Sequence, residues 1–238
     1  MNDVAETTPG HRPASHAARP PIVRPRDAAS LILLRGHGRD LELLAGRRPG
    51  HVRFMPGVYV FPGGAIDPED RREWRVETAA DVLPSRLQHC ARAALRETWE
   101  ESAVLFGRPA ALPVEPNPAM TAIEATYAAS GIAAAIDALT YIGRAITPTP
   151  VFRRFNTRFF LGDGDDVHGE PQSTDELEDV RWHPVGRQEL APFRDVTQFM
   201  LARAIAVRDG TASPDVPLMC TVRKVRQIRV CREAIRDI

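Results

Sequence analysis

The sequence has little of what defines several large classes of protein. Its three cysteines are odd in number and widely spaced, so they provide neither a disulfide framework nor a paired-cysteine metal site, and they are typical of a reducing compartment. No apolar run approaches the length of a membrane span, and the first residues lack the apolar segment of a secretory signal. We therefore expect a cytoplasmic protein with no membrane partner.

Net charge is absent as well. Lys and Arg number 31, as do Asp and Glu, so nothing in the charge balance favours a nucleic acid partner. A hydrophobic fraction of 43% is enough for a core, and 238 residues suit one domain with appendages. Residues 1–26 are rich in Pro, Ala, Arg and His without a period, and we expect them to form a disordered tail.

The remainder of the chain mixes strand and helix patterns. Two apolar runs joined by a glycine-bearing turn predict a β-hairpin over 28–35 and 40–45. Further strand patterns lie at 58–61, 154–161 and 177–182. Helix patterns lie at 87–106, 118–143 and 196–207 and after Pro184, and a basic strand or helix closes the chain. Strands and helices without strict alternation predict an α+β or α/β/α arrangement around a mixed sheet.

The segment Arg96-Glu97-Thr98-Trp99-Glu100-Glu101 carries the most chemical content. On a helix, Glu97 and Glu101 are one turn apart and point the same way, with Glu100 beside them. Carboxylates this close repel one another unless a cation lies between them, and Mg²⁺ and Mn²⁺ prefer such oxygen ligands. Arg96 can hold the Glu100 carboxylate in one orientation. The same string also occurs on ordinary solvated helix faces, so the segment alone leaves both interpretations open.

Two motifs together resemble the signature of the Nudix hydrolase family. That signature is Gly, five residues, Glu, seven residues, Arg-Glu, an aliphatic residue, any residue, Glu-Glu, any residue, Gly and an aliphatic residue. Gly64 follows a strand pattern and matches its opening, and residues 96–104 match its closing half. The flanking strings RFMPG (53–57) and RFNTRFF (154–160) resemble the subgroup with an interrupted signature, which includes the mammalian coenzyme A diphosphatase. Residues 177–185 are similar to the strand that many Nudix domains carry before their last helix.

The chain departs from the signature in three respects. Gly64 and Arg96 are 32 positions apart where the signature has 14, which indicates an 18-residue insertion at about 71–88. The signature's first Glu has no clean counterpart: Asp70 falls at its spacing from Gly64, and its spacing from Arg96 gives no acidic residue. Thr98 replaces an aliphatic residue and Ala103 replaces Gly. Trp74 lies in the insertion, which is expected to form a lid, to stack on a base or to be a plain surface helix.

The resemblance implies a Nudix-type α/β/α sandwich over 27–207, followed by a C-terminal extension over 208–238. It implies hydrolysis of the phosphoanhydride bond of a nucleoside-diphosphate-linked compound, with Mg²⁺ or Mn²⁺ as cofactor. The implied metal ligands are Gly64, Glu97, Glu100 and Glu101. The implied catalytic residues are Arg96, Glu97, Glu100, Glu101 and a late acidic residue, for which Glu176 and Glu178 are candidates. Basic residues expected to contact the substrate are Arg47, Arg48, Arg53 and Arg158.

Substrate and assembly are less constrained. Coenzyme A or an acyl derivative, and ADP-ribose or another nucleotide sugar, all suit the same core, because fold and metal site do not set the substrate. A non-catalytic, nucleotide-binding regulatory module is the alternative of another class. Such a module would be expected to have lost its carboxylates, whereas all of them are present here. Nudix domains often pair, so a homodimer is a further expectation.

Overall fold

The computed structural model describes residues 23–53, 55–79, 82–149, 151, 153–185 and 195–231. Its centre is a mixed nine-stranded sheet with the order β10-β2-β1-β8-β7-β11-β12, with β3 beside β2 and β4 beside β1. The strands of this sheet are β1 (Arg26–Arg35), β2 (Glu42–Arg47), β3 (Tyr59–Val60), β4 (Gly63–Ala65), β7 (Thr140–Ile146), β8 (Phe155–Asp163), β10 (Glu178–Pro184), β11 (Pro217–Val222) and β12 (Val225–Val230). The predicted hairpin is confirmed, since β1 and β2 pair in antiparallel fashion.

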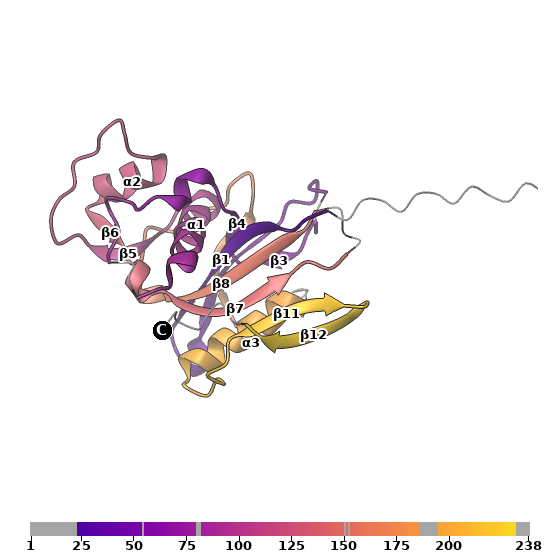
Figure 1. Ribbon diagram of the computed structural model, residues 1–238. Coiled ribbons are helices and arrows are strands. Elements are labelled where there is room, and N and C mark those ends of the chain that lie inside the picture. The colour runs from indigo at the N-terminus through magenta and orange to yellow at the C-terminus, as the bar shows by residue number, and fades with distance from the viewer. Residues whose placement is uncertain are drawn as a thin grey trace, which may run out of the picture.

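Helices α1 (Ser85–Ser102) and α3 (Asp195–Arg208) cover opposite faces of this sheet (Figure 1). Alternation along β1 explains both contacts, because successive side chains of a strand point to opposite faces. Leu31 and Leu33 pack in the same core cluster as the buried face of α1. Ile32 and Leu34 pack in a second cluster with Met200 of α3. The molecule is therefore the α/β/α sandwich with a mixed sheet that the sequence predicts.

A smaller unit packs at the end of the molecule beside α1. It contains α2 (Ala122–Ser130) and the short strands β6 (Ile132–Ala134), β5 (Leu105–Pro109) and β9 (Val167–His168), in the order β6-β5-β9. Four 3-10 turns complete the described elements: η1 (Gly38–Asp40), η2 (Pro68–Arg71), η3 (Ile136–Ala138) and η4 (Gly164–Asp166).

The insertion at 71–88 is part of this packing. Trp74 is only 2% exposed and its ring centroid lies 6.3 Å from that of Tyr127. Glu77 accepts two hydrogen bonds from the buried guanidinium of Arg92, at 2.6 and 2.7 Å. The expectation of a lid or an exposed surface helix is wrong, because the apolar side chains of the insertion fill the space between α1 and α2.

Three secondary-structure expectations need correction or completion. The helix predicted over 87–106 ends at Ser102, since Ala103 has a φ of 60° and the chain continues into β5. The region 118–143 contains one helix, α2, and then β-prone residues that form β6 and the start of β7. The basic C-terminal segment forms strands β11 and β12 of the main sheet. The predicted helix over 196–207 is confirmed as α3.

Several expectations lie on residues outside those described: most of the predicted tail (1–22), the helical region after Pro184 (186–194), Phe54 of the RFMPG string, and residues 232–238. Within the described part of the chain, none of the helices combines the length and apolarity that a membrane span requires.

Candidate functional site

The site is formed where α1 crosses the glycine corner of β4. Leu87, Ala91, Ala94 and Leu95 bury one side of α1 in the core. The acidic residues of α1 then lie on the side that meets β4. Gly63 and Gly64 pair with Ser30 and Ala29 of β1, which fixes the corner on the sheet.

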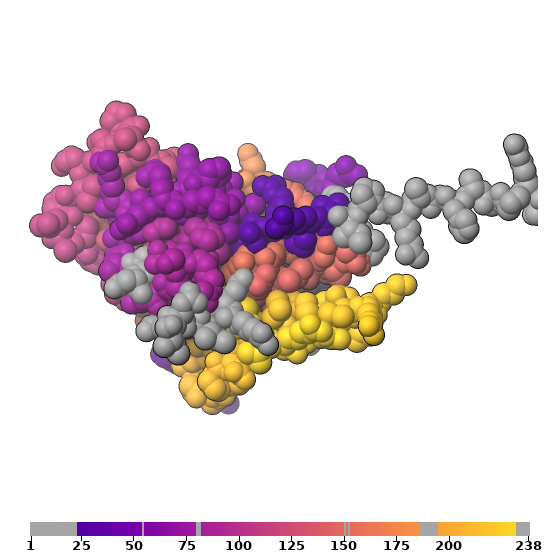
Figure 2. Space-filling model, viewed as in Figure 1, coloured from indigo at the N-terminus to yellow at the C-terminus, as the bar shows by residue number. Residues whose placement is uncertain are grey.

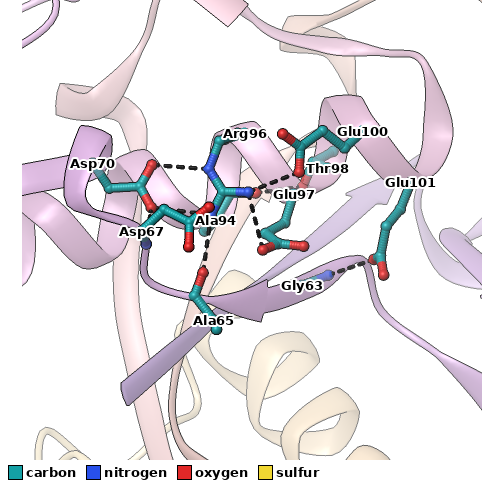
Figure 3. A network of polar contacts seen from close by, with 10 residues as sticks. All are labelled: Gly63, Ala65, Asp67, Asp70, Ala94, Arg96, Glu97, Thr98, Glu100 and Glu101. Carbon is teal, nitrogen blue, oxygen red and sulfur yellow. Dashed lines mark hydrogen bonds and ion pairs between the residues drawn. The ribbon is translucent and has the colours of Figure 1, made fainter. Parts of the chain in front are cut away.

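Arg96 organises the polar side of α1 (Figure 3). Its guanidinium donates to both carboxylate oxygens of Asp70, each at 3.0 Å, and to the carbonyl of Ala65 at 2.9 Å. The remaining nitrogen donates to Glu97 at 3.1 Å and to Glu100 at 2.7 Å. Burial opposes the charge of Arg96, but Asp70 and the two glutamates outweigh it and raise the pKa of this residue. Arg96 is thus permanently charged and held in one orientation, and it aligns two carboxylates.

Glu97 lies directly against the backbone of Gly64. A Cβ atom at position 64 would stand 2.3 to 2.4 Å from the carboxylate atoms of Glu97, so a larger residue there would force the Glu97 side chain to move. Burial raises the pKa of Glu97 to about 7, against the opposing charge of Arg96 and with the help of Glu100. The Glu97 carboxylate therefore lies against the main chain of the glycine corner.

Glu101 is the most deeply buried carboxylate of the group, at 3% exposure. Burial raises its pKa to about 8, although the backbone N–H of Gly63 donates to it at 2.7 Å. The charges of Glu97 and Glu176 raise its pKa further, and that of Arg48 lowers it. Burial also raises the pKa of Glu100. A buried cluster of carboxylates with insufficient positive charge is the arrangement that a cation would stabilise.

The loop before β10 brings a fourth carboxylate to this cluster. The hydroxyl of Thr174 accepts hydrogen bonds from the N–H groups of Glu176 and Leu177, at 3.2 and 3.3 Å, and donates to the carbonyl of Glu101 at 3.4 Å. The N–H of Gln172 donates to the carbonyl of Ser102 at 3.0 Å. The loop is therefore docked on the last turn of α1, and it sets the exposed Glu176 beside Glu97, Glu100 and Glu101.

These residues line one side of a cavity of about 730 Å³, which is of the size of a nucleotide site. Its wall includes Arg48, Arg96, Glu97, Glu100, Glu101 and Glu176. The cavity extends across the sheet on the side of α3, where it is lined by Phe155, Phe159, Thr197 and Met219.

Other predicted residues lie away from this cavity. Glu178 pairs with Arg47 at 3.0 Å, and both side chains are about half exposed. Arg158 binds Asp27 at 2.6 Å, whereas its strand neighbours Thr157 and Phe159 face the cavity. Arg53 is described but does not line the cavity. Of the four basic residues expected at the substrate, the structure brings Arg48 to the cavity, and of the two late glutamates it brings Glu176.

The donor set fits a hard divalent cation. It consists of carboxylate oxygens from Glu97, Glu100 and Glu101 and the main chain at Gly64, which are the ligand types that Mg²⁺ and Mn²⁺ prefer. Within the described residues, no three acidic, imidazole or thiol groups already stand at metal-ligand separations. Since Mg²⁺ usually keeps several waters and binds through one or two carboxylates and substrate phosphates, such a preformed cage is not required.

Similarity to known proteins agrees with this geometry. No protein-family model matches the chain. A NUDIX hydrolase from Alicyclobacillus acidocaldarius is 31% identical to this chain in sequence. Its crystal structure superposes on this one with a TM-score of 0.61, and the match covers 81% of this chain and 99% of that chain. This chain belongs to the Nudix hydrolase family. A Caenorhabditis elegans protein named nudix hydrolase 7 is 32% identical over 168 residues, which cover 66% of this chain but only 50% of the worm protein.

The structure accounts for the departures from the Nudix signature. Asp70 supplies the acid that pairs with Arg96, while Arg92 is bound to Glu77 within the insertion. Thr98 is buried and donates its hydroxyl to the carbonyl of Ala94, so it is accommodated without a free polar group. Ala103 adopts the left-handed conformation that a glycine at this position would favour.

Proposed function

We propose that this chain is a Mg²⁺- or Mn²⁺-dependent diphosphatase that hydrolyses the phosphoanhydride bond of a nucleoside-diphosphate-linked compound. The observation that carries the proposal is the group of buried carboxylates, Glu97 and Glu101, with pKa values raised to about 7 and 8, at a cavity wall against a glycine corner. Family membership and the size of the cavity support it. A binding-only role is disfavoured because every carboxylate of the closing half-signature is kept and faces the cavity.

In this mechanism the residues of the chain position charge and move one proton. Glu97, Glu100 and Glu101, with the Gly64 carbonyl, would hold the cation, which supplies neutralisation of the diphosphate and a more acidic water when bound. Arg96 keeps Glu97 and Glu100 in place, and Arg48 offers a guanidinium to phosphate oxygens. A water oxygen forms a bond to one phosphorus as the bridging P–O bond breaks, and the bridging oxygen leaves on the other phosphate. The water's proton passes to the carboxylate of Glu176 and then to solvent.

For the substrate we propose coenzyme A or an acyl derivative. The interrupted signature and the RFMPG and RFNTRFF strings support this choice. ADP-ribose is the alternative, since the same catalytic core would serve it. The three cysteines are free thiols, which supports a reducing location such as the cytoplasm.

The test measures the release of the two phosphate-bearing products from coenzyme A, an acyl derivative, ADP-ribose and NADH, with Mg²⁺ and with Mn²⁺. We expect turnover that EDTA abolishes and that Glu101→Gln lowers by about 10³-fold or more. Glu115→Gln, which changes an exposed glutamate away from the cavity, is the matched control and should retain full activity. Turnover that persists in EDTA, or that is undiminished in Glu101→Gln, would contradict the proposed function.

A further inference from the structure

A hydrogen bond outside the site joins the two loops that bring Arg48 and Glu176 to the cavity. These are the β2–β3 loop (48–58) and the β9–β10 loop (169–177). The hydroxyl of Tyr59, just after the first loop, donates to the carboxylate of Asp179, just after the second, at 2.5 Å and across 120 positions of the chain. In Figure 2 the β9–β10 loop, in orange, and the β2–β3 loop, in purple, both project from the upper edge of the molecule. Neither Tyr59 nor Asp179 lines the cavity itself.

Asp179 lies in a β-bulge, which bends the chain where the β9–β10 loop enters the sheet. The register of β10 against β2 passes from the pair Glu178 and Arg47 to the pair Arg181 and Ala45, so three steps along β10 oppose two along β2. Asp179 has a φ of 49°, in the left-handed region that Asp and Asn adopt more readily than other side chains. Bulges of this kind change the direction of a strand and of the residues beside it. The conformation of Asp179 therefore sets the direction in which the loop leaves β10.

Four contacts hold Asp179 and Tyr59 in one arrangement. One carboxylate oxygen of Asp179 accepts from Tyr59, and the other accepts from Nε of Arg181 at 3.0 Å. The carbonyl of Asp179 accepts from Nε2 of the fully buried His183 at 3.2 Å. The His183 ring also packs against that of Tyr59, with centroids 5.1 Å apart and the planes at 74°. Burial opposes the charge of Asp179, but Tyr59 and Arg181 outweigh it and keep its pKa below the ordinary value.

The backbone beside Tyr59 fixes Arg48 in turn. Tyr59 stands opposite Arg47 in the pairing of β3 with β2. The N–H of Arg48 donates to the carbonyl of Val58 at 3.0 Å, and the carbonyl of Arg48 accepts from the N–H of Gly57 at 2.9 Å. Arg48 is thus bonded to the two residues that precede Tyr59, so a displacement of Tyr59 is transmitted to the main chain of Arg48.

We propose that the Tyr59–Asp179 pair is a positioning device that holds Arg48 and Glu176 in a fixed relation at the cavity. This inference rests on the proposed function, in which Arg48 meets phosphate oxygens and Glu176 accepts the proton of the attacking water. Both members of the pair act through the loops and touch no substrate. Without the bond, a misplaced Arg48 raises KM and a misplaced Glu176 lowers kcat.

Single variants separate the hydrogen bond from the fold. Tyr59→Phe keeps the ring against His183 but removes the hydroxyl, and we expect kcat to fall roughly tenfold and KM to rise severalfold. Asp179→Gly keeps the left-handed backbone accessible without an acceptor and should do the same. Asp179→Asn keeps an acceptor oxygen and tolerates the left-handed conformation, so it should stay within about twofold of the unmodified chain. Tyr127→Phe is the matched control: its hydroxyl donates to the carbonyl of Phe106 at 2.9 Å in the smaller unit, so its loss should lower stability and leave kcat and KM unchanged.

Combined variants show whether the pair acts through the two loops. In a Glu176→Gln background, Tyr59→Phe should lower kcat little further, and in an Arg48→Ala background it should raise KM little further. Effects that multiply fully in both backgrounds would mean that Tyr59 acts on the fold as a whole, and would overturn the inference. Unchanged kinetics in Tyr59→Phe would overturn it too, as would a loss in Asp179→Asn as large as in Asp179→Gly.

Hydrogen exchange gives a readout that needs no turnover. Tyr59→Phe and Asp179→Gly should speed amide exchange in both the β2–β3 and the β9–β10 loop, whereas Tyr127→Phe should leave both loops unchanged. Unchanged exchange in both loops of Tyr59→Phe would overturn the inference. The two proposals fail separately: cation-dependent hydrolysis with no effect of Tyr59→Phe removes the role of the pair and leaves the diphosphatase. Faster loop exchange in a chain that hydrolyses none of the substrates refutes the diphosphatase and leaves the pair as the link between the loops.

Discussion

Arg96 binds both carboxylate oxygens of Asp70, each at 3.0 Å, although the two residues are 26 positions apart in the chain. Asp70 is fully buried and Arg96 nearly so. The pair connects the segment before the insertion to α1, so the insertion leaves the two halves of the signature in contact. The same guanidinium orients Glu97 and Glu100, which makes Asp70 a support for the candidate metal site.

Replacing Asp70 by Ala should therefore affect both stability and activity. It leaves the buried Arg96 charge without its main partner, which typically costs about 3–5 kcal/mol in the free energy of unfolding. We also expect kcat to fall, since Arg96 is then free to turn away from Glu97 and Glu100. Urea denaturation and steady-state kinetics measure the two effects. Glu69→Gln, at the exposed neighbouring position, is the control and should change neither quantity.

The substitution Gly64→Ala, which adds a methyl group, should lower activity more than it lowers stability. Its Cβ would stand within 2.4 Å of the Glu97 carboxylate carbon and force that side chain to move. A displacement of about 1 Å in a catalytic group can cost about 100-fold in rate, so we expect a loss of that order in Gly64→Ala. Gly50→Ala, where an added Cβ meets nothing within 4 Å, should retain full activity. A fully active Gly64→Ala enzyme would show that Glu97 is not held against the corner for catalysis.

We expect a substitution at the C-terminal end of α1 to stabilise the fold. Ala103 has a φ of 60° at the C-cap of α1, and its N–H donates to the carbonyl of Trp99 at 2.8 Å. The left-handed conformation costs an L-residue about 1 kcal/mol relative to glycine, so Ala103→Gly should raise the free energy of unfolding by that amount. Ala202→Gly, at an exposed position within α3, should lower it by about 1 kcal/mol. Thermal and urea unfolding of both variants test whether the signs are opposite.

The fold was largely predictable because its elements have clear local periodicity. The pattern of β1 and β2 and the buried stripe of α1 are visible in the sequence and reappear in the structure. The region 118–143 is predicted to hold one or two helices and contains one, α2, because its alanine-rich composition suits helix locally, while pairing of Thr140–Ile146 with β8 makes its last part a strand. Such pairing joins residues distant in the chain, and no local pattern records it.

The candidate site was less predictable at its edges than at its centre. The carboxylates of α1 are spaced by helix geometry, which the sequence displays directly. Arg47 and Arg48 are adjacent, so one faces Glu178 and the other faces the cavity, and only the register of β2 decides which. Arg226 of β12 lines the cavity through a sheet order that no motif indicates. The contribution of the β11–β12 hairpin to the cavity wall therefore had no signal in the sequence alone.

Glu124 should give stability a specific dependence on pH. It is fully buried and accepts hydrogen bonds from Thr121 and from Arg72 and the N–H of Arg75, which lower its pKa despite the opposing effect of burial. The folded chain therefore holds this proton less tightly than the unfolded chain, whose glutamate titrates near 4.5. The stabilisation is complete above that pH and is lost as the pH falls through the depressed folded value.

Glu124→Gln should accordingly lower the free energy of unfolding by about 2 kcal/mol near pH 7, since it removes hydrogen bonds to a charged acceptor. The difference from the unmodified chain should shrink as the pH is lowered below the value at which an unfolded glutamate titrates. Urea titrations across the acidic range measure this difference directly. A gap that stays constant down to the lowest pH would mean that shape, and not the charge of Glu124, stabilises the insertion.

Thr174 offers a test of Glu176 that leaves every carboxylate in place. Its hydroxyl accepts from the N–H groups of Glu176 and Leu177 and donates to the carbonyl of Glu101, so it joins the loop to α1. Thr174→Ala removes all three contacts, and we expect kcat to fall about 10- to 100-fold with a small change in KM, because a displaced general base transfers the proton less efficiently. Thr174→Ser keeps the hydroxyl, and its kcat should remain within about twofold of that of the unmodified enzyme.

If the kcat of Thr174→Ser is as low as that of Thr174→Ala, the methyl group of Thr174 matters through packing and the loop does not position Glu176. If both variants are fully active while Glu176→Gln is not, Glu176 acts without needing this anchor.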